Sequence, residues 1–158
     1  MVTCHVGNGG SIAAVVDGKC IDTSMGLTPL EGLMMGTRAG DIDGGAITFI
    51  EKKLGLDADG MSNLLNKKSG VAGLTGGSSD MRDVESAAKS GDARAKLAQD
   101  MYFYRIKKYI GAYAAAMGGL DVVVFTAGVG ENQISMRSEV CKDMEFLGIK
   151  FDEEKNKD

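Results

Sequence analysis

Three short apolar runs open the chain and predict β-strands. The first, Val2 to Val6, ends at a glycine-rich stretch, Gly7 to Ser11. The second, Ile12 to Val16, ends at Asp17-Gly18, a dipeptide that favours a tight hairpin turn. Lys19 to Met25 alternates enough to be the returning strand. The N-terminal region is therefore predicted to hold three strands, with an open glycine turn between the first two.

Apolar residues then recur at helical spacing between residues 42 and 54. Asp41 or Asp43 is placed to cap the start of this helix, and Gly55 to end it. Residues 56–68 predict a second short helix.

The longest helical pattern runs from Asp92 to roughly Met117, and Gly118-Gly119 is typical of its end. Its apolar side is expected to include Leu97, Met101, Tyr104, Ile110 and Ala114.

Two further segments combine glycine with a neighbouring element. Residues 70–79 read as a glycine-rich loop that leads into a helix capped by Ser78 or Ser79. Residues 121–125 are an apolar strand of the kind buried in a parallel or mixed sheet. Residues 126–130 join this strand to a helix expected to start at Glu131 or Asn132, an order of elements found at nucleotide sites.

Composition places the chain among ordinary globular proteins. At 158 residues, with 44% hydrophobic and 25% charged residues, it is long enough for one domain with an ordinary core. We expect residues 1–150 to form this single domain and 151–158 to be a charged, solvated tail. A net charge of −4 argues against nucleic acid as a partner.

The cysteine pattern and the apolar segments limit the cellular setting. Three cysteines without a Cys-x-x-Cys pair support neither a disulfide framework nor a structural zinc site, which favours a reducing cytoplasmic location. No signal peptide is visible at the start. The stretch from Tyr109 to Gly130 has Asp121 as its only charged residue, but Gly118-Gly119 interrupts it, so no membrane span is predicted.

The loop from Thr28 to Asp43 carries the first candidate chemistry. It holds the only proline, Pro29, and places Arg38 among small residues. Such a loop suits a guanidinium aimed at an anion, with phosphate as the first hypothesis. The alternative is a structural ion pair between Arg38 and Asp41 or Asp43.

Glycine-rich segments at residues 7–11, 70–79 and 128–132 extend this hypothesis. None is a P-loop or a dinucleotide fingerprint, and each taken alone is best explained as a turn. Together with Arg38 they indicate loops that hold the phosphates and another part of a nucleotide. His5, the only histidine, is either a structural residue at a strand end or a phosphate contact.

Five segments together resemble the acetate kinase family, and the resemblance covers essentially the whole chain. They are Thr3 to Gly9, Asp22 to Gly26, Thr28 to Asp43, Ser78 to Asp83 and Phe125 to Asn132, in the family's order and spacing.

The resemblance implies a fold, an activity and partners. The fold would be an RNase H-like domain of the acetate and sugar kinase/Hsp70/actin superfamily, an α/β fold with a mixed sheet and flanking helices. The activity would be reversible phosphoryl transfer between ATP and acetate, giving acetyl phosphate. The family usually forms homodimers through this C-terminal domain.

Roles for individual residues follow from the same resemblance. Arg38 would stabilise the transition state, and Pro29 would line the pocket for the acyl methyl group. The remaining positions would bind ATP or ADP: the phosphate hairpin His5, Val6, Gly7, Asn8 and Gly9, the adenosine region Asp80, Met81 and Arg82, and the loop Gly128, Val129, Gly130, Glu131 and Asn132.

The family pattern also includes parts that this sequence does not match. Family members have a preceding domain with further catalytic residues and a closing segment with a glutamate for Mg²⁺. The chain therefore resembles a C-terminal portion, expected to be inactive alone, with its magnesium ligands elsewhere. A propionate or butyrate kinase and a noncatalytic assembly module remain the alternative interpretations.

Overall fold

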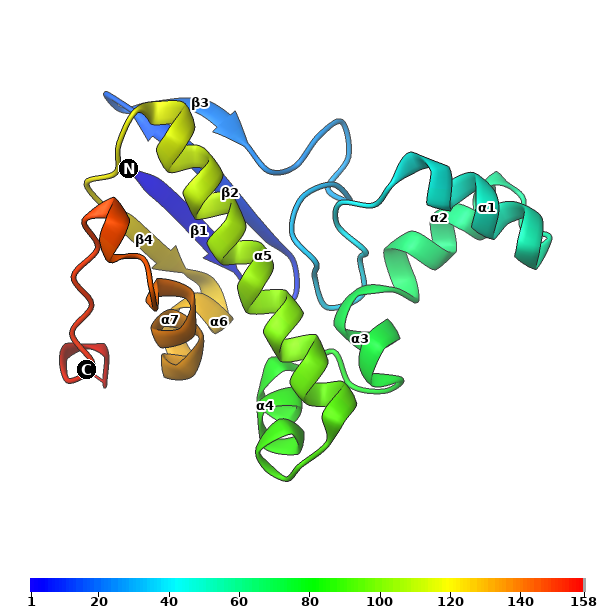
Figure 1. Ribbon diagram of the computed structural model, residues 1–158. Coiled ribbons are helices and arrows are strands. Elements are labelled where there is room, and N and C mark those ends of the chain that lie inside the picture. The colour runs from blue at the N-terminus through cyan, green and yellow to red at the C-terminus, as the bar shows by residue number, and fades with distance from the viewer. Residues whose placement is uncertain (158) are drawn as a thin grey trace.

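A computed structural model describes residues 1–157 and shows a four-stranded mixed sheet flanked by helices (Figure 1). The strands are β1 (Val2–Val6), β2 (Gly10–Val16), β3 (Lys19–Thr23) and β4 (Val123–Thr126). Their order is β3-β2-β1-β4, with β1 antiparallel to β2 and parallel to β4. The predicted α/β class, with a mixed sheet, is therefore confirmed.

The predicted hairpin between β2 and β3 is present. Asp17 and Gly18 both take positive φ angles, 49° and 75°, the backbone that a two-residue turn of this hand requires. Alternation along β1 buries Val2, Cys4 and Val6 completely. One face of the sheet thus forms the floor of the core.

Seven helices and two 3₁₀ turns complete the part of the chain that the structure describes. α1 and α2 extend away from the sheet (Figure 1), and no residue of α1 is buried. The helices are α1 (Gly44–Leu54), α2 (Ala58–Lys67), α3 (Gly70–Thr75), α4 (Met81–Lys89), α5 (Ala93–Met117), α6 (Ala127–Asn132) and α7 (Ile134–Cys141), with 3₁₀ turns at Glu145–Leu147 and Lys155–Lys157.

The long helix α5 lies across the sheet and has the predicted ends. The Asp92 side chain accepts hydrogen bonds from the backbone N–H groups of Arg94 and Ala95, at 2.8 and 3.1 Å, and Gly118 ends the helix with φ 73°. These local signals were sufficient because they depend only on neighbouring residues.

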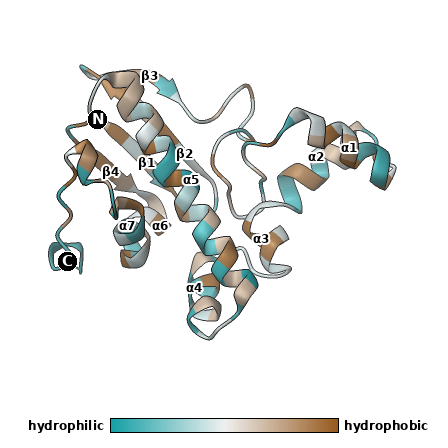
Figure 2. Cartoon of the chain, in the orientation of Figure 1, coloured by the Kyte–Doolittle hydropathy of each residue, from teal (hydrophilic) through white to brown (hydrophobic). Residues whose placement is uncertain are grey.

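The predicted apolar side of α5 was partly wrong. Ile110 and Ala114 are buried, but Leu97, Met101 and Tyr104 are 53%, 40% and 62% exposed. Hydrophobic and hydrophilic residues are mixed along the visible side of the helix (Figure 2), and more than one set of apolar residues recurs at helical spacing, so periodicity alone does not choose the buried face. The residues that do pack inward are Ala95, Ala98, Tyr102, Phe103, Ile106, Ile110, Tyr113 and Ala114.

The two candidate caps of α1 have different roles. Asp43 is the N-cap and accepts a hydrogen bond from the Gly45 backbone N–H at 3.0 Å, and Gly55 ends the helix with φ 65°. Asp41 instead binds Arg105 of α5. The roles of Asp41 and Asp43 differ only because Asp41 lies next to Arg105 in the folded chain.

The segment 70–79 is not a loop throughout, because α3 occupies its first part. The predicted serine caps are also wrong. Asp80 caps α4 and accepts from the Arg82 backbone N–H at 2.9 Å. The Ser78 hydroxyl accepts from the Asp80 backbone N–H and donates to Asp83 Oδ2, which makes a turn one step before the helix.

The helix after β4 starts earlier than predicted, at Ala127 rather than Glu131 or Asn132. Gly128 and Gly130 disfavour a helix by intrinsic propensity. The Glu131 carboxylate compensates by accepting from the free Ala127 backbone N–H at 2.8 Å. Side-chain capping thus stabilises a short helix in glycine-rich sequence.

The predicted solvated tail folds back against α7. Asn156 is only 9% exposed, and its side chain accepts from Arg137 Nε at 2.7 Å and donates to the Ile134 carbonyl at 3.0 Å. Asp158, at the end of that tail, lies outside the described residues. Within residues 1–157, no helix is both long and apolar enough to cross a membrane.

Candidate functional site

A cavity of about 760 Å³ lies where the end of β1 meets α4, α5 and α6. Its wall combines backbone of the glycine turn after β1 with side chains from these helices. The lining residues are Gly7, Asn8, Gly36, Ser79, Asp80, Met81, Arg82, Glu85, Tyr102, Gly128, Val129, Asn132 and Gln133. The structure therefore brings together residues from all three glycine-rich segments of the sequence.

The turn after β1 is held by contacts on both sides. The Gly7 N–H donates to the Gly9 carbonyl at 2.9 Å, and the Tyr102 hydroxyl donates to the Gly7 carbonyl at 3.0 Å. From the other side, the Gly36 N–H donates to the Asn8 carbonyl at 2.9 Å. The turn is thus positioned before any ligand arrives.

A glycine at residue 36 favours this close approach. A Cβ at residue 36 would lie 2.1 Å from Asn8 Oδ1 and 3.2 Å from the Asn8 carbonyl oxygen. The glycine therefore lets the loop that carries Arg38 contact the turn through its backbone.

Asp80 and Arg82 form a two-point ion pair at the start of α4. Arg82 Nε donates to Asp80 Oδ1 at 3.0 Å, and Arg82 Nη2 contacts Oδ2 at 2.6 Å. These bonds lower the pKa of Asp80 from its ordinary value of 3.8 to about 2. The Arg82 side chain is 90% exposed, whereas Met81 between them is buried, so a charged rim stands over an apolar wall.

The α6 segment presents Gly128, Val129 and Asn132 to the cavity. Asn132 Nδ2 donates to the Gly128 carbonyl at 2.8 Å, which holds the segment's two ends together. Ala127, at its start, has φ 66°, an uncommon conformation for a residue with a Cβ. A strained residue beside a cavity is the kind of position that ligand sites contain.

Glu85 and Gln133 line the cavity, and sequence reasoning missed both. Glu85 Oε1 accepts from the Ser135 hydroxyl at 2.9 Å, and Oε2 accepts from Gln133 Nε2 at 3.2 Å. Burial acts to raise the pKa of Glu85, but hydrogen bonds from Lys89 and Ser135 outweigh it, so the pKa is lowered. Glu85 is therefore an anion beside the cavity.

Three other lining residues were also outside the prediction: Gly36, Ser79 and Tyr102. Gly36 lies within the predicted loop 28–43, and Ser79 lies within the predicted glycine-rich segment 70–79. The sequence thus selected their segments but not these two residues. Tyr102 and Glu85 sit inside helices, where nothing in the local sequence distinguishes them from ordinary helical residues.

Seven predicted residues do not line the cavity. Val6 belongs to the core, and His5 shares a 3.0 Å hydrogen bond between its Nδ1 and Thr126 Oγ1. Gly9 lies in the turn itself. The seven predicted residues that do not line the cavity are His5, Val6, Gly9, Pro29, Arg38, Gly130 and Glu131.

Arg38 lies beside the glycine turn. Its Nη1 would be 3.6 Å from a Cβ built at Gly9, and it donates to the Pro29 carbonyl at 3.3 Å. Within residues 1–157, no carboxylate forms an ion pair with Arg38. The alternative of a structural pair with Asp41 or Asp43 is therefore wrong, since Asp41 binds Arg105 instead.

Comparison with known proteins identifies the family. A sequence model of the acetokinase family matches residues 1–158. The chain belongs to the acetokinase family. Acetate kinase from Bacteroides fragilis is 71% identical over 157 residues, a match that covers 99% of this chain and 39% of that protein.

Solved structures of similar proteins share the fold. The crystal structure of Porphyromonas gingivalis acetate kinase superposes with a TM-score of 0.96 at 62% identity, over 98% of this chain and 39% of that one. A propionate kinase from Francisella tularensis gives a TM-score of 0.93 at 46% identity, over 98% and 40%. The chain thus spans about two fifths of the length of these relatives, and the predicted acetate and sugar kinase type of fold is confirmed.

Proposed function

We propose that this chain supplies the nucleotide-binding part of an acetate kinase, an enzyme that transfers a phosphoryl group reversibly between ATP and acetate. One observation carries the proposal: the turn at Gly7-Asn8, the Asp80–Arg82 pair and α6 come from distant parts of the sequence and line one cavity. A cavity of about 760 Å³ is in the size range of small-molecule sites.

Different lining residues of the cavity suit different parts of ATP or ADP. Backbone N–H groups of a glycine turn can bind phosphate oxygens, and the Gly7 N–H is already used within the turn, so the phosphates are assigned to the turn at Asn8. The apolar Met81 and Val129 suit the flat base. Gly128 and Asn132 also line the cavity.

Arg38 is assigned to the transferred phosphoryl group. Phosphoryl transfer requires mainly positioning and positive charge at the equatorial oxygens, and acetate is already an anionic nucleophile. Since no carboxylate of the described residues neutralises Arg38 and its guanidinium lies next to the turn, its charge is available for this role. Pro29, whose carbonyl accepts from Arg38, is assigned to the acyl side.

Magnesium is expected with the nucleotide, because phosphoryl transfer from ATP uses it generally. Among residues 1–157, no three His, Cys, Asp or Glu side chains are grouped so as to hold a metal. We therefore assign no magnesium ligand to this chain, and no step of the proposal depends on one.

A homodimer in the cytoplasm is proposed from the family resemblance. Long apolar side chains are exposed on both α1 and α5, such as Phe49 at 62% and Leu97 at 53%. Sedimentation equilibrium measures dimer formation directly, and a monomer at all concentrations would contradict it.

Propionate is the second candidate for the acyl substrate, because the propionate kinase of Francisella tularensis shares the fold at a TM-score of 0.93. Turnover of acetate, propionate and butyrate by a protein that joins this chain to the rest of the family's length separates the candidates. A higher kcat/KM for propionate would overturn the assignment to acetate.

Calorimetric titration with ATP and ADP tests the nucleotide site in the chain itself. We expect binding, a weaker affinity for Asn8→Ala, and no change for Asn63→Ala, because Asn63 is exposed on α2 and does not line the cavity. We also expect no hydroxamate formation from acetate and ATP by this chain alone. Absence of nucleotide binding would favour a noncatalytic assembly module instead.

A further inference from the structure

We propose that Asp41 is a positioning residue through which α5 holds the Arg38 loop in place against the glycine turn. The inference deepens the proposed function, because Arg38 and the turn form the phosphate end of that site. It is carried by hydrogen bonds that connect one face of α5 to both parts.

The first connection joins α5 to the turn. Tyr102 is 2% exposed, and its hydroxyl donates to the Gly7 carbonyl at 3.0 Å. Burial raises the pKa of Tyr102, so its hydroxyl keeps the proton that it donates. The turn is thereby attached to a helix anchored in the core.

The second connection joins α5 to the loop through Asp41. Arg105 Nη2 forms an ion pair with Asp41 Oδ2, and the Tyr109 hydroxyl donates to the same oxygen at 2.8 Å. The other oxygen, Oδ1, accepts from the Gly32 backbone N–H at 2.8 Å. Both carboxylate oxygens are thus engaged, one by the helix and one by the loop.

Asp41 also closes the loop on itself. Its backbone N–H donates to the Gly32 carbonyl at 3.0 Å, so residues 32–41 form a closed segment with Arg38 inside it. Within this segment the Met35 N–H donates to the Arg38 carbonyl at 3.1 Å. A shift of Asp41 would therefore move the Arg38 backbone with it.

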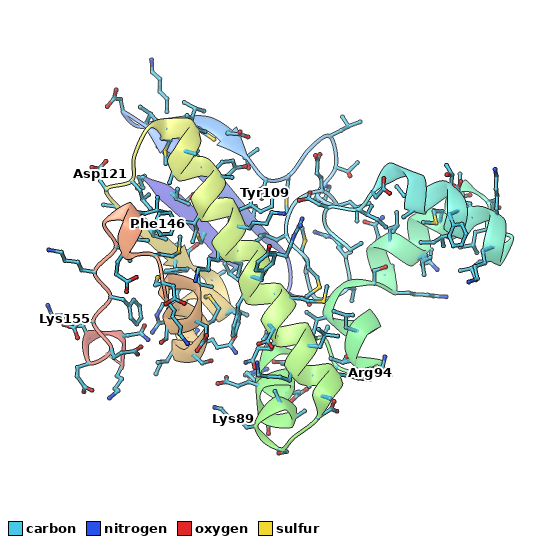
Figure 3. The ribbon with its side chains drawn as sticks, in the orientation of Figure 1. Lys89, Arg94, Tyr109, Asp121, Phe146 and Lys155 are labelled. Carbon is cyan, nitrogen blue, oxygen red and sulfur yellow. The ribbon has the colours of Figure 1, made fainter. Side chains whose placement is uncertain are left out.

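Helix geometry places the connecting side chains together. Tyr102, Arg105 and Tyr109 are three and then four residues apart, so they lie on one face of α5, about two turns from end to end. Figure 3 labels Tyr109 between α5 and the loop that follows β3. Since α5 is one continuous helix, the spacing between the turn and the loop is set by the helix.

The ligand-free chain provides the first test. Tyr109→Phe removes one hydrogen bond to Asp41, and Asp41→Asn weakens the contact with Arg105 while keeping the side-chain size. The matched control is Tyr104→Phe, the same chemical change on an exposed residue of the same helix with no side-chain hydrogen bond among the described residues.

Hydrogen exchange measured by mass spectrometry reports on the loop. We expect at least about tenfold faster exchange over residues 32–41 in Asp41→Asn, a smaller increase in Tyr109→Phe, and no change in Tyr104→Phe. Exchange at residues 134–141 of α7, which form no hydrogen bond with this loop within residues 1–157, serves as the internal reference. Unchanged exchange over 32–41 in both variants would overturn the inference, whether or not the chain binds nucleotide.

Nucleotide affinity provides the second test and separates positioning from general destabilisation. If Asp41 positions the phosphate end, Asp41→Asn weakens ATP binding about tenfold and leaves adenosine binding unchanged. Equal losses for ATP and adenosine would overturn the positioning role. Failure of the unsubstituted chain to bind ATP would instead overturn the proposed function, and the exchange result would still decide the role of Asp41.

Discussion

Replacement of Gly70 by alanine tests the packing of α3 against the backbone of the Arg38 loop. Gly70 has φ 61°, and a Cβ there would lie 2.2 Å from the Met35 carbonyl oxygen and 2.7 Å from the Arg38 carbonyl oxygen. Both obstacles are backbone atoms, which cannot rotate away. The Val71 N–H also donates to the Met35 carbonyl at 3.0 Å, so the clash falls on a contact that the loop uses.

Gly18→Ala is the matched control. Gly18 has φ 75°, but a Cβ there meets no atom within 4 Å. Both substitutions force alanine into a left-handed conformation, which costs about 1–2 kcal/mol. Only Gly70→Ala adds steric overlap, which costs about 1–3 kcal/mol in a packed site. The expected losses in free energy of unfolding are therefore about 1–2 kcal/mol for Gly18→Ala and about 2–5 kcal/mol for Gly70→Ala.

Urea unfolding followed by circular dichroism measures this difference, because the linear extrapolation gives the free energy of unfolding of each variant. The melting temperature should fall by roughly 2–4 °C for each kcal/mol lost in a chain of this length. If the two variants agree within about 0.5 kcal/mol, the packing of Gly70 against the loop is refuted. A larger loss in Gly18→Ala would refute the steric argument as well.

Two further predictions concern ionisation. Arg82→Ala should raise the pKa of Asp80 from about 2 toward its ordinary 3.8, followed by NMR titration of the carboxyl group. Because the folded-state pKa of Asp80 is lowered, the stabilisation from this pair is complete above about pH 4 and is lost as the pH falls toward 2. A pKa of Asp80 that is unchanged in Arg82→Ala would show that the pair does not form. Burial raises the pKa of Cys4 to about 12 and that of Cys141 to about 11, whereas Cys20 is exposed. A thiol reagent at pH 8 should thus label Cys20 alone until denaturant is added, and equally fast labelling of either buried cysteine would contradict this.

The elements that the sequence predicted correctly depend on interactions between residues close together in the chain. The hairpin at Asp17-Gly18 and the ends of α5 at Asp92 and Gly118 were predictable, because turn and cap geometry depends on residues within one turn of the chain. The start of α6 at Ala127 was not, because a capping bond from Glu131 outweighs the low helix propensity of the glycines.

The residues that line the cavity also divide into those that local sequence patterns predicted and those that they did not. The sequence alone selected the segments that line it, since glycine clusters and family motifs are local patterns. It did not select Glu85 or Tyr102, which are ordinary helical residues by sequence. Tyr102 is 95 residues from Gly7, its hydrogen-bond partner, and only packing of α5 on the sheet joins them.

The sequence by itself determined the family, the mixed α/β class, and which loops carry glycine and arginine for an anion. The tertiary structure decided which of two aspartates caps α1 and which binds Arg105, and which face of α5 is buried. The physical reason is that a local conformation depends on neighbouring residues, whereas the partner of a side chain depends on which distant surfaces pack together. Asp41 and Tyr109, 68 residues apart, meet only because the whole chain has folded around α5.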